Sequence, residues 1–138
     1  MVADTYYPKV DGTLIFMQEF LKRTKKTFDI SLLVPNLGSK KEKDVTYIEP
    51  SKWISLSGYP NMKLSFSNLR KIKKAIKEVD LLFIQGPSLI SYLSMYYGRK
   101  YKKKTISFLH VISWELFEKT SPWPFSKLLS KIIKKFFS

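Results

Sequence analysis

The stretch Met1-Val-Ala-Asp4-Thr-Tyr-Tyr-Pro-Lys-Val-Asp11-Gly12, followed by an apolar-periodic run from Thr13, decides the fold that we expect for this chain. Val2-Ala3 is typical of the end of a buried strand, and the residues after it form a loop. Asp11-Gly12 supplies a tight turn, and Thr13 begins a helix. A strand, a glycine-containing turn and a helix N-terminus in this order point backbone N–H groups at an anion. A single glycine is a weak signal alone, so the rest of the chain must support this prediction.

Helices and strands alternate along the remaining sequence. Helical spacing of apolar residues predicts helices at 13–26, 67–77 (with Ser67 or Asn68 as the cap) and 87–100, and a short helix around 114–119. Apolar runs predict strands at 28–34, 45–48, 80–85 and 104–109. Residues 51–61 show no period and are interpreted as a loop, with a short strand at 63–66. This alternation predicts an α/β fold with a Rossmann-like, doubly wound, mainly parallel sheet.

The composition excludes several kinds of site. Of the 138 residues, 44% are hydrophobic and 15% aromatic, which indicates a folded domain. The chain has no cysteine and one histidine, so disulfides, thiolate metal sites, cysteine nucleophiles and His-based metal clusters are excluded, and we expect no metal. The sequence has no visible signal peptide and no apolar run of the ~20 residues that span a bilayer. We therefore expect a cytoplasmic location.

The charge predicts an anionic partner. The sequence has 25 Lys and Arg against 11 Asp and Glu, a net charge of +14. Nucleic acid, an anionic lipid surface or a phosphorylated small molecule all suit such an excess, and a merely solvated lysine-rich surface explains it almost as well. The lysines are scattered over several elements, and arginine is scarce (Arg23, Arg70 and Arg99). With no nucleic-acid-binding motif, these features argue against nucleic acid.

Three strand ends converge if the sheet is parallel: Asp4–Gly12, Gln85–Ser88 and His110–Glu115. His110 is the only imidazole, and it directly follows an apolar strand. A histidine at that position can exchange hydrogen bonds with a sugar hydroxyl or a phosphate near neutral pH. A histidine bonded to a neighbouring carbonyl is the alternative. The position of His110 directly after this strand favours a functional role.

The other crevice candidates have structural alternatives. Ser88 caps a helix or binds an anion, and capping is favoured. Trp114 stacks on a sugar or packs in the core, and core packing is favoured. Asp11 and Glu115 are carboxylates near the crevice, and we assign them no paired acid–base role.

These segments resemble the retaining glycosyltransferases of family 4, which have the GT-B fold. Asp4–Gly12 looks like the family's first loop, and Ile84–Ser88 and Phe108–Glu115 follow in the order and spacing of its next two crevice segments. The resemblance implies the acceptor-binding, N-terminal half of an enzyme that moves a sugar from a nucleotide-sugar onto a lipid or glycan acceptor, with no further cofactor. It implies that Gly12 brings backbone close to the donor phosphates and that catalytic His110 contacts the transferred sugar. The binding residues would be Asp11, Gly12, Thr13, Gln85, Pro87, Ser88, Trp114 and Glu115.

Two departures from the family pattern qualify this expectation. Asp11-Gly12 stands where many members have Gly-Gly, although an Asp-Gly variant is familiar. The second Rossmann-like domain, which in such enzymes binds the nucleotide through two spaced glutamates, has no counterpart in 1–138. We therefore expect one domain over 1–138, incomplete at both ends, and inactive or nearly so without the missing C-terminal domain. The short first strand agrees with this view, since a strand normally has about five or six residues.

The last stretch, 125–137, predicts a basic amphipathic helix. Its apolar residues recur at i, i+3, i+4, i+7, i+8, i+11 and i+12, flanked by Lys127, Lys131, Lys134 and Lys135. At about 20 Å it is too short to span a membrane but suits the interface of one. Packing against the sheet or a missing domain is slightly favoured over peripheral association with the inner membrane face. A nonenzymatic basic α/β module that binds anionic membrane or nucleic acid remains the alternative function.

Overall fold

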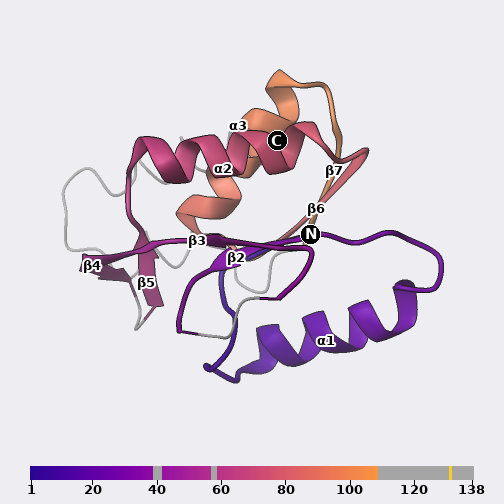
Figure 1. Cartoon of the computed structure of the whole chain (residues 1–138), viewed down its shortest axis with the longest axis horizontal. Helices are drawn as coiled ribbons and strands as arrows, with labels where there is room; N and C mark the ends of the chain where they lie inside the picture. The colour runs from indigo at the N-terminus through magenta and orange to yellow at the C-terminus, as the bar shows by residue number, and fades with distance from the viewer. Residues whose placement is uncertain (39–41, 57–58, 109–130, 132–138) are drawn as a thin grey trace. The chain divides into compact units, whose positions relative to one another are not determined.

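The computed structural model describes residues 1–38, 42–56, 59–108 and 131 (Figure 1). The chain divides into two units, Met1–Phe108 and Leu109–Ser138, and the fold described below is that of the first unit. Its described residues form a five-stranded, parallel sheet in the order β3-β2-β1-β6-β7. The strands are β1 (Val2–Ala3), β2 (Leu32–Pro35), β3 (Val45–Ile48), β6 (Leu81–Gln85) and β7 (Lys104–Phe108).

Helices cover both faces of this sheet. In the described unit, α1 (Gly12–Thr24) lies on one face, and α2 (Phe66–Lys77) and α3 (Leu89–Lys100) lie on the other (Figure 1). Because the strands are parallel and the helices occupy both faces, the fold is the predicted α/β, Rossmann-like, doubly wound arrangement. In the described ranges, no helix is both long and apolar enough to cross a membrane.

Side chains of alternating strand positions form the core on the two faces of the sheet. On the α1 face, Leu14 and Met17 are buried in a cluster with Ala3 and Val34. Aromatic stacking extends this layer, since Phe16 lies 4.6 Å from Phe108 between ring centroids and Phe20 lies 4.8 Å from Phe83.

On the other face, the sheet approaches α3 closely at a glycine. Leu82 and Ile84 of β6 are buried there, as are Ile72 and Ile76 of α2. A Cβ atom at Gly98 would lie 3.0 Å from Leu82 Cδ2, so only a glycine lets the helix come this near without displacing its neighbour.

The region 50–66 differs from the prediction. The expected loop at 51–61 is instead an antiparallel hairpin of β4 (Pro50–Leu56) and β5 (Tyr59–Met62). Its register shifts between Pro50 and Ser55, so side chains lose the simple alternation that identifies a strand in sequence. Pro60 pairs with Ser55 at a hairpin that belongs to no larger sheet, where proline is tolerated.

The expected strand at 63–66 is also wrong, because α2 begins there. Ser65 caps this helix by accepting from the N–H of Asn68, which replaces the predicted cap at Ser67 or Asn68. Asn68 is instead fully buried: its amide accepts from the N–H of Glu49 (3.1 Å) and donates to the carbonyls of Glu49 (2.9 Å) and Lys63 (2.8 Å). It therefore fastens the start of α2 to the hairpin.

Most other boundaries lie close to the prediction. Strands Val2–Ala3 and Val45–Ile48 are confirmed. The strand expected at 28–34 begins only at Leu32, because the N–H of Phe28 still bonds to the carbonyl of Thr24 in the turn that ends α1 (3.0 Å). The helices predicted at 114–119 and 125–137 lie outside the described residues, apart from position 131.

Candidate functional site

The strand order creates a crevice position between β1 and β6. From β1 the chain proceeds outward through β2 to β3, then returns to place β6 on the other side of β1. Ala3 pairs with Gln85, so the carboxyl ends of these two strands lie side by side. In open α/β sheets, ligands bind outside the carboxyl ends of the strands at this kind of reversal. The loops after β1 and β6 are therefore the candidate site.

The loop after β1 is organised by Asp11. One carboxylate oxygen accepts from the backbone N–H of Leu14 (2.9 Å), and the other accepts from the hydroxyl of buried Thr5 (3.2 Å). Asp11 is thus the N-cap of α1, and Gly12 is its first helical residue. The predicted tight turn at Asp11-Gly12 and the helix start at Thr13 are wrong, because the capping carboxylate begins the helix one residue earlier.

Gly12 adds no side chain beside the N-terminus of α1, which the Asp11 carboxylate caps. A Cβ atom at this exposed position would meet no atom within 4 Å. A ligand can therefore approach the backbone here without displacing a protein side chain. Neighbouring Thr13 is half-buried, and its carbonyl is held by the second loop.

Gln85 joins the two loops. Its fully buried amide donates to the carbonyl of Thr13 (2.8 Å), which connects residues far apart in the sequence. Two of the predicted site residues are thus brought together. This bond fixes the position of α1 relative to the end of β6.

The turn after β6 depends on Gly86 and its contact with Asp4. Gly86 has φ +89°, and a Cβ atom there would collide with the carboxylate of Asp4. Its N–H donates to the carbonyl of Phe108 (3.2 Å), which holds the end of β7 in the same region. Only glycine suits both the backbone angle and the space. Sequence reasoning missed Asp4 and Gly86 as site residues, although each is the residue directly after a buried strand.

Ser88 caps a helix, which is the role that the sequence favoured over anion binding. Its hydroxyl accepts from the N–H of Ser91 (3.3 Å) and lies 3.2 Å from the Ser91 hydroxyl, so it caps α3. Pro87, between this cap and Gly86, is half-buried. His110, Trp114 and Glu115 lie outside the described residues, so the arrival of the third strand end at this crevice stays a prediction.

The pKa of Asp4 is shifted by its surroundings. Burial is the main cause that raises it to about 6, a backbone hydrogen bond opposes the rise, and the nearby charge of Asp11 adds to it. A carboxyl group that titrates in this range can donate a hydrogen bond to a hydroxyl or accept a proton from one near neutral pH. Within the described part of the chain, no group of three His, Asp or Glu side chains is placed to hold a metal ion.

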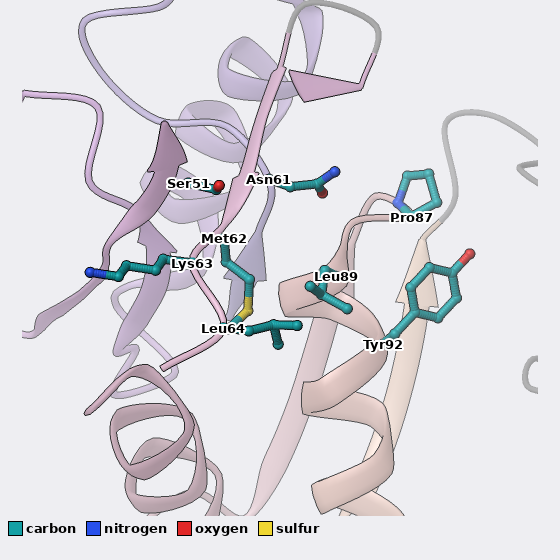
Figure 2. Close-up of a pocket in the computed structure, with 8 residues that line it drawn as sticks. All are labelled: Ser51, Asn61, Met62, Lys63, Leu64, Pro87, Leu89 and Tyr92. Atoms are coloured by element: carbon teal, nitrogen blue, oxygen red, sulfur yellow. The ribbon is translucent and has the colours of Figure 1, made fainter. Parts of the chain in front are cut away.

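An open cleft begins beside this site at Pro87. Its volume is about 310 Å³, and we call it the apolar cleft (Figure 2). It lies between the end of the hairpin and the first turn of α3. Its lining residues are Ser51, Asn61, Met62, Lys63, Leu64, Pro87, Leu89 and Tyr92.

Comparison of the chain with models of protein families, with curated proteins and with solved structures finds no match.

Proposed function

We propose that this chain is the acceptor-side half of a retaining glycosyltransferase of the GT-B type, which moves a sugar from a nucleotide-sugar onto a lipid or glycan acceptor. The single observation that supports it is the joining of two of the three segments on which the resemblance rests. Asp4–Gly12 follows β1, and Gln85–Ser88 begins at the last residue of the adjacent parallel strand β6. The amide of Gln85 bonds to the carbonyl of Thr13, the residue directly after Gly12. The two segments meet where α/β folds bind ligands.

The residues of this edge suit the proposed chemistry. The start of α1 lets donor phosphates approach its backbone at Gly12, where no side chain is in the way. Asp4, with a pKa of about 6, is able to hydrogen-bond a sugar hydroxyl either as donor or as acceptor. In this proposal, His110 contacts the transferred sugar, and the nucleotide is held mainly by a second Rossmann-like domain. Trp114 and Glu115 belong to the same segment as His110.

The test measures transfer of radiolabelled sugar from a panel of nucleotide-sugars to total lipid and glycan extracts, using the product of the full reading frame that carries this sequence. His110→Ala should lower kcat by about 100-fold or more, because a positioned acid or base contributes at least that much. Gly12→Val should lower the rate by roughly tenfold or more, because its side chain occupies the space of the donor. Transfer that is unchanged by both substitutions would contradict the proposal.

A matched control separates loss of function from loss of fold. Glu19→Val puts the same side chain on the exposed face of the same helix, away from its N-terminus. We expect this variant to transfer sugar at the normal rate. The two valine variants should have similar urea midpoints, since Gly12 has free space around it.

A second candidate function is supported by a cationic cluster at the opposite edge of the sheet. Here Lys103 Nζ donates to the carbonyl of Lys77 (3.0 Å), and Lys77 Nζ lies 5.2 Å from the centre of the Tyr101 ring. Exposed cations adjoin Tyr101 and Lys103 in the sequence: Arg99, Lys100, Lys102 and Lys104. A nonenzymatic module would use them to bind anionic membrane or nucleic acid.

Binding at two salt concentrations tests this second function. The chain is mixed with vesicles containing phosphatidylserine, and separately with duplex DNA, at 50 and 500 mM salt. Salt-sensitive binding that Lys100→Glu with Lys104→Glu abolishes, together with absence of sugar transfer, would favour it over the enzyme. The same binding accompanied by His110-dependent transfer would instead describe an enzyme that works at a membrane.

A further inference from the structure

The apolar cleft continues from the candidate site. Pro87 lines it and directly follows Gly86, whose turn touches the Asp4 carboxylate. Leu89 and Tyr92, from the first turn of α3, form one wall. Met62 and Leu64, at and just after the end of β5, form the facing wall. A ligand that extends from the Asp4 carboxyl past Pro87 would therefore enter this cleft.

The walls of the cleft are mainly apolar. Figure 2 shows the side chains of Met62, Leu64 and Leu89 directed toward the same space. Lys63 is the only charged residue among the eight that line the cleft, and its ammonium group points away from the other side chains (Figure 2). The amide of Asn61 is turned toward Pro87, at the end nearest the candidate site (Figure 2). The cleft thus offers apolar contact along its length and a polar group at one end.

The dimensions and exposure of the cleft restrict its occupant. Its 310 Å³ is near the lower limit of roughly 300 Å³ for ligand pockets, so a narrow group suits it better than a bulky one. Leu64 keeps 69% of its surface exposed, and covering it would remove apolar area from water. Met62, a flexible side chain, adapts to a narrow aliphatic group.

We propose that the apolar cleft binds an alkyl chain of the acceptor, with the acceptor's hydroxyl-bearing head at Asp4. This inference rests on the proposed function and narrows it. Of the two acceptor classes, lipid and glycan, it selects an uncharged amphipathic lipid. A purely polar glycan would leave exposed Leu64 and half-buried Leu89 in contact with water, and a charged tail would meet no counter-charge inside the cleft.

Direct binding to the 138-residue chain tests the alkyl site without any transfer. Octyl β-glucoside, kept below its micelle concentration, is compared with methyl β-glucoside, which has the same sugar and lacks the chain. Methyl NMR should show saturable shifts at Met62, Leu64 and Leu89 with the octyl compound and none with the methyl compound. Equal binding of both, or octyl-induced shifts confined to other methyl groups, would overturn the proposal.

Two exposed apolar residues on the same segment supply a matched pair of variants. Leu64 lines the cleft, whereas Phe66, 91% exposed, does not. Leu64→Asn should weaken octyl glucoside binding about tenfold, because one leucine side chain loses its apolar contact. Phe66→Asn should leave the affinity unchanged. Equal effects of the two substitutions would indicate general surface hydrophobicity and overturn the site.

The two proposals fail in different ways. If octyl glucoside binds at the three methyl groups but the full reading frame transfers no sugar, the alkyl site stands and the glycosyltransferase assignment fails. If the protein transfers sugar equally well to acceptors with and without an alkyl chain, and Leu64→Asn leaves KM unchanged, the glycosyltransferase stands and the alkyl site is overturned.

Discussion

The two edges of the parallel sheet are built by different rules. At the carboxyl edge, Thr5 and Gln85 are fully buried, and each makes a hydrogen bond to the loop or helix after β1. At the amino edge, exposed cations lie at and just after the end of α3: Arg99, Lys100, Lys102 and Lys104. Each edge contains a turn with positive φ: Gly86 at +89° and Lys102 at +53°. One position accepts only glycine, while the other has a lysine.

The surroundings explain this difference. Gly86 faces the Asp4 carboxylate, so no Cβ atom fits. Lys102 ends α3 in a Schellman motif, in which the N–H of Lys103 bonds to the carbonyl of Gly98 (2.8 Å) and that of Lys102 to Arg99 (3.1 Å). Its side chain extends into solvent. Packing therefore fixes the residue at the carboxyl edge, and solvent permits many residues at the amino edge. We therefore locate the candidate site at the carboxyl edge, where packing restricts which residue a position accepts.

Replacing Gly86 should have the largest effect on stability. In Gly86→Ala the new methyl group collides with the Asp4 carboxylate, and the backbone keeps a left-handed angle that alanine disfavours. We expect a loss of about 3 kcal/mol in the free energy of unfolding, the sum of the two costs. Urea denaturation followed by far-UV circular dichroism measures it.

Gly12→Ala is the control for this substitution. Gly12 is helical and has open space around it, so alanine should stabilise the chain by about 0.5 kcal/mol through the unfolded state. If both substitutions cost the same, the contrast between a packed and an open glycine at this edge is wrong. A Gly86→Ala variant as stable as the parent would mean that Asp4 does not occupy the turn.

The next prediction is that stability depends on pH through the two groups that flank β1, the Met1 amino group and the Asp4 carboxyl group. The pKa of Asp4 rises from 3.8 to about 6 because the carboxyl is buried. Its contribution to stability is therefore full below pH 3.8 and is lost as the pH rises through 6, a change of roughly 3 kcal/mol at most. Burial lowers the pKa of the Met1 amino group from 8.0 to about 6, so its contribution is full above pH 8 and is lost as the pH falls through 6. Together these groups predict a stability minimum near pH 6.

Two modifications separate the fall and the rise in stability on either side of pH 6. Asp4→Asn should remove the fall in stability between pH 4 and 6, and acetylation of the Met1 amino group should remove the rise between pH 6 and 8. Asp29→Asn, which removes an exposed carboxylate, should leave the shape unchanged. Urea midpoints at half-unit pH steps supply the measurement. A parent profile without a minimum between pH 5 and 7 would contradict the assignment of these two groups.

Local sequence pattern was sufficient for most of the fold. Leu81–Gln85 lies within the strand predicted at 80–85, and Ser88 caps α3 as predicted. Both signals are strong because a buried parallel strand is apolar at successive positions and a serine before a helix has a definite bonding role. The same pattern of strand, turn and helix N-terminus identified the loops after Ala3 and Gln85. The order of strands in the sheet places these loops next to each other.

What the sequence could not supply depends on contacts between distant residues. The collision that requires Gly86 involves Asp4, on a different strand, so the glycine looked like one more turn residue. Asn68 resembled a helix cap, but its amide bonds to Glu49 and Lys63, which only the folded hairpin presents. The hairpin itself escaped prediction because its register shift interrupts the period of two.

A gain in stability at the amino edge is expected at Lys102. Glycine has no penalty at a φ of +53°, so Lys102→Gly should stabilise the chain by about 1 kcal/mol without removing a buried contact. Lys100→Gly makes the same substitution two residues earlier, within α3, and should cost about 0.8 kcal/mol because glycine weakens a helix. Opposite signs in urea denaturation would show that backbone angle, not lysine charge, determines stability at this edge. Equal losses from both would mean that the two lysines contribute through their charge, and the contrast between the edges would then be one of electrostatics.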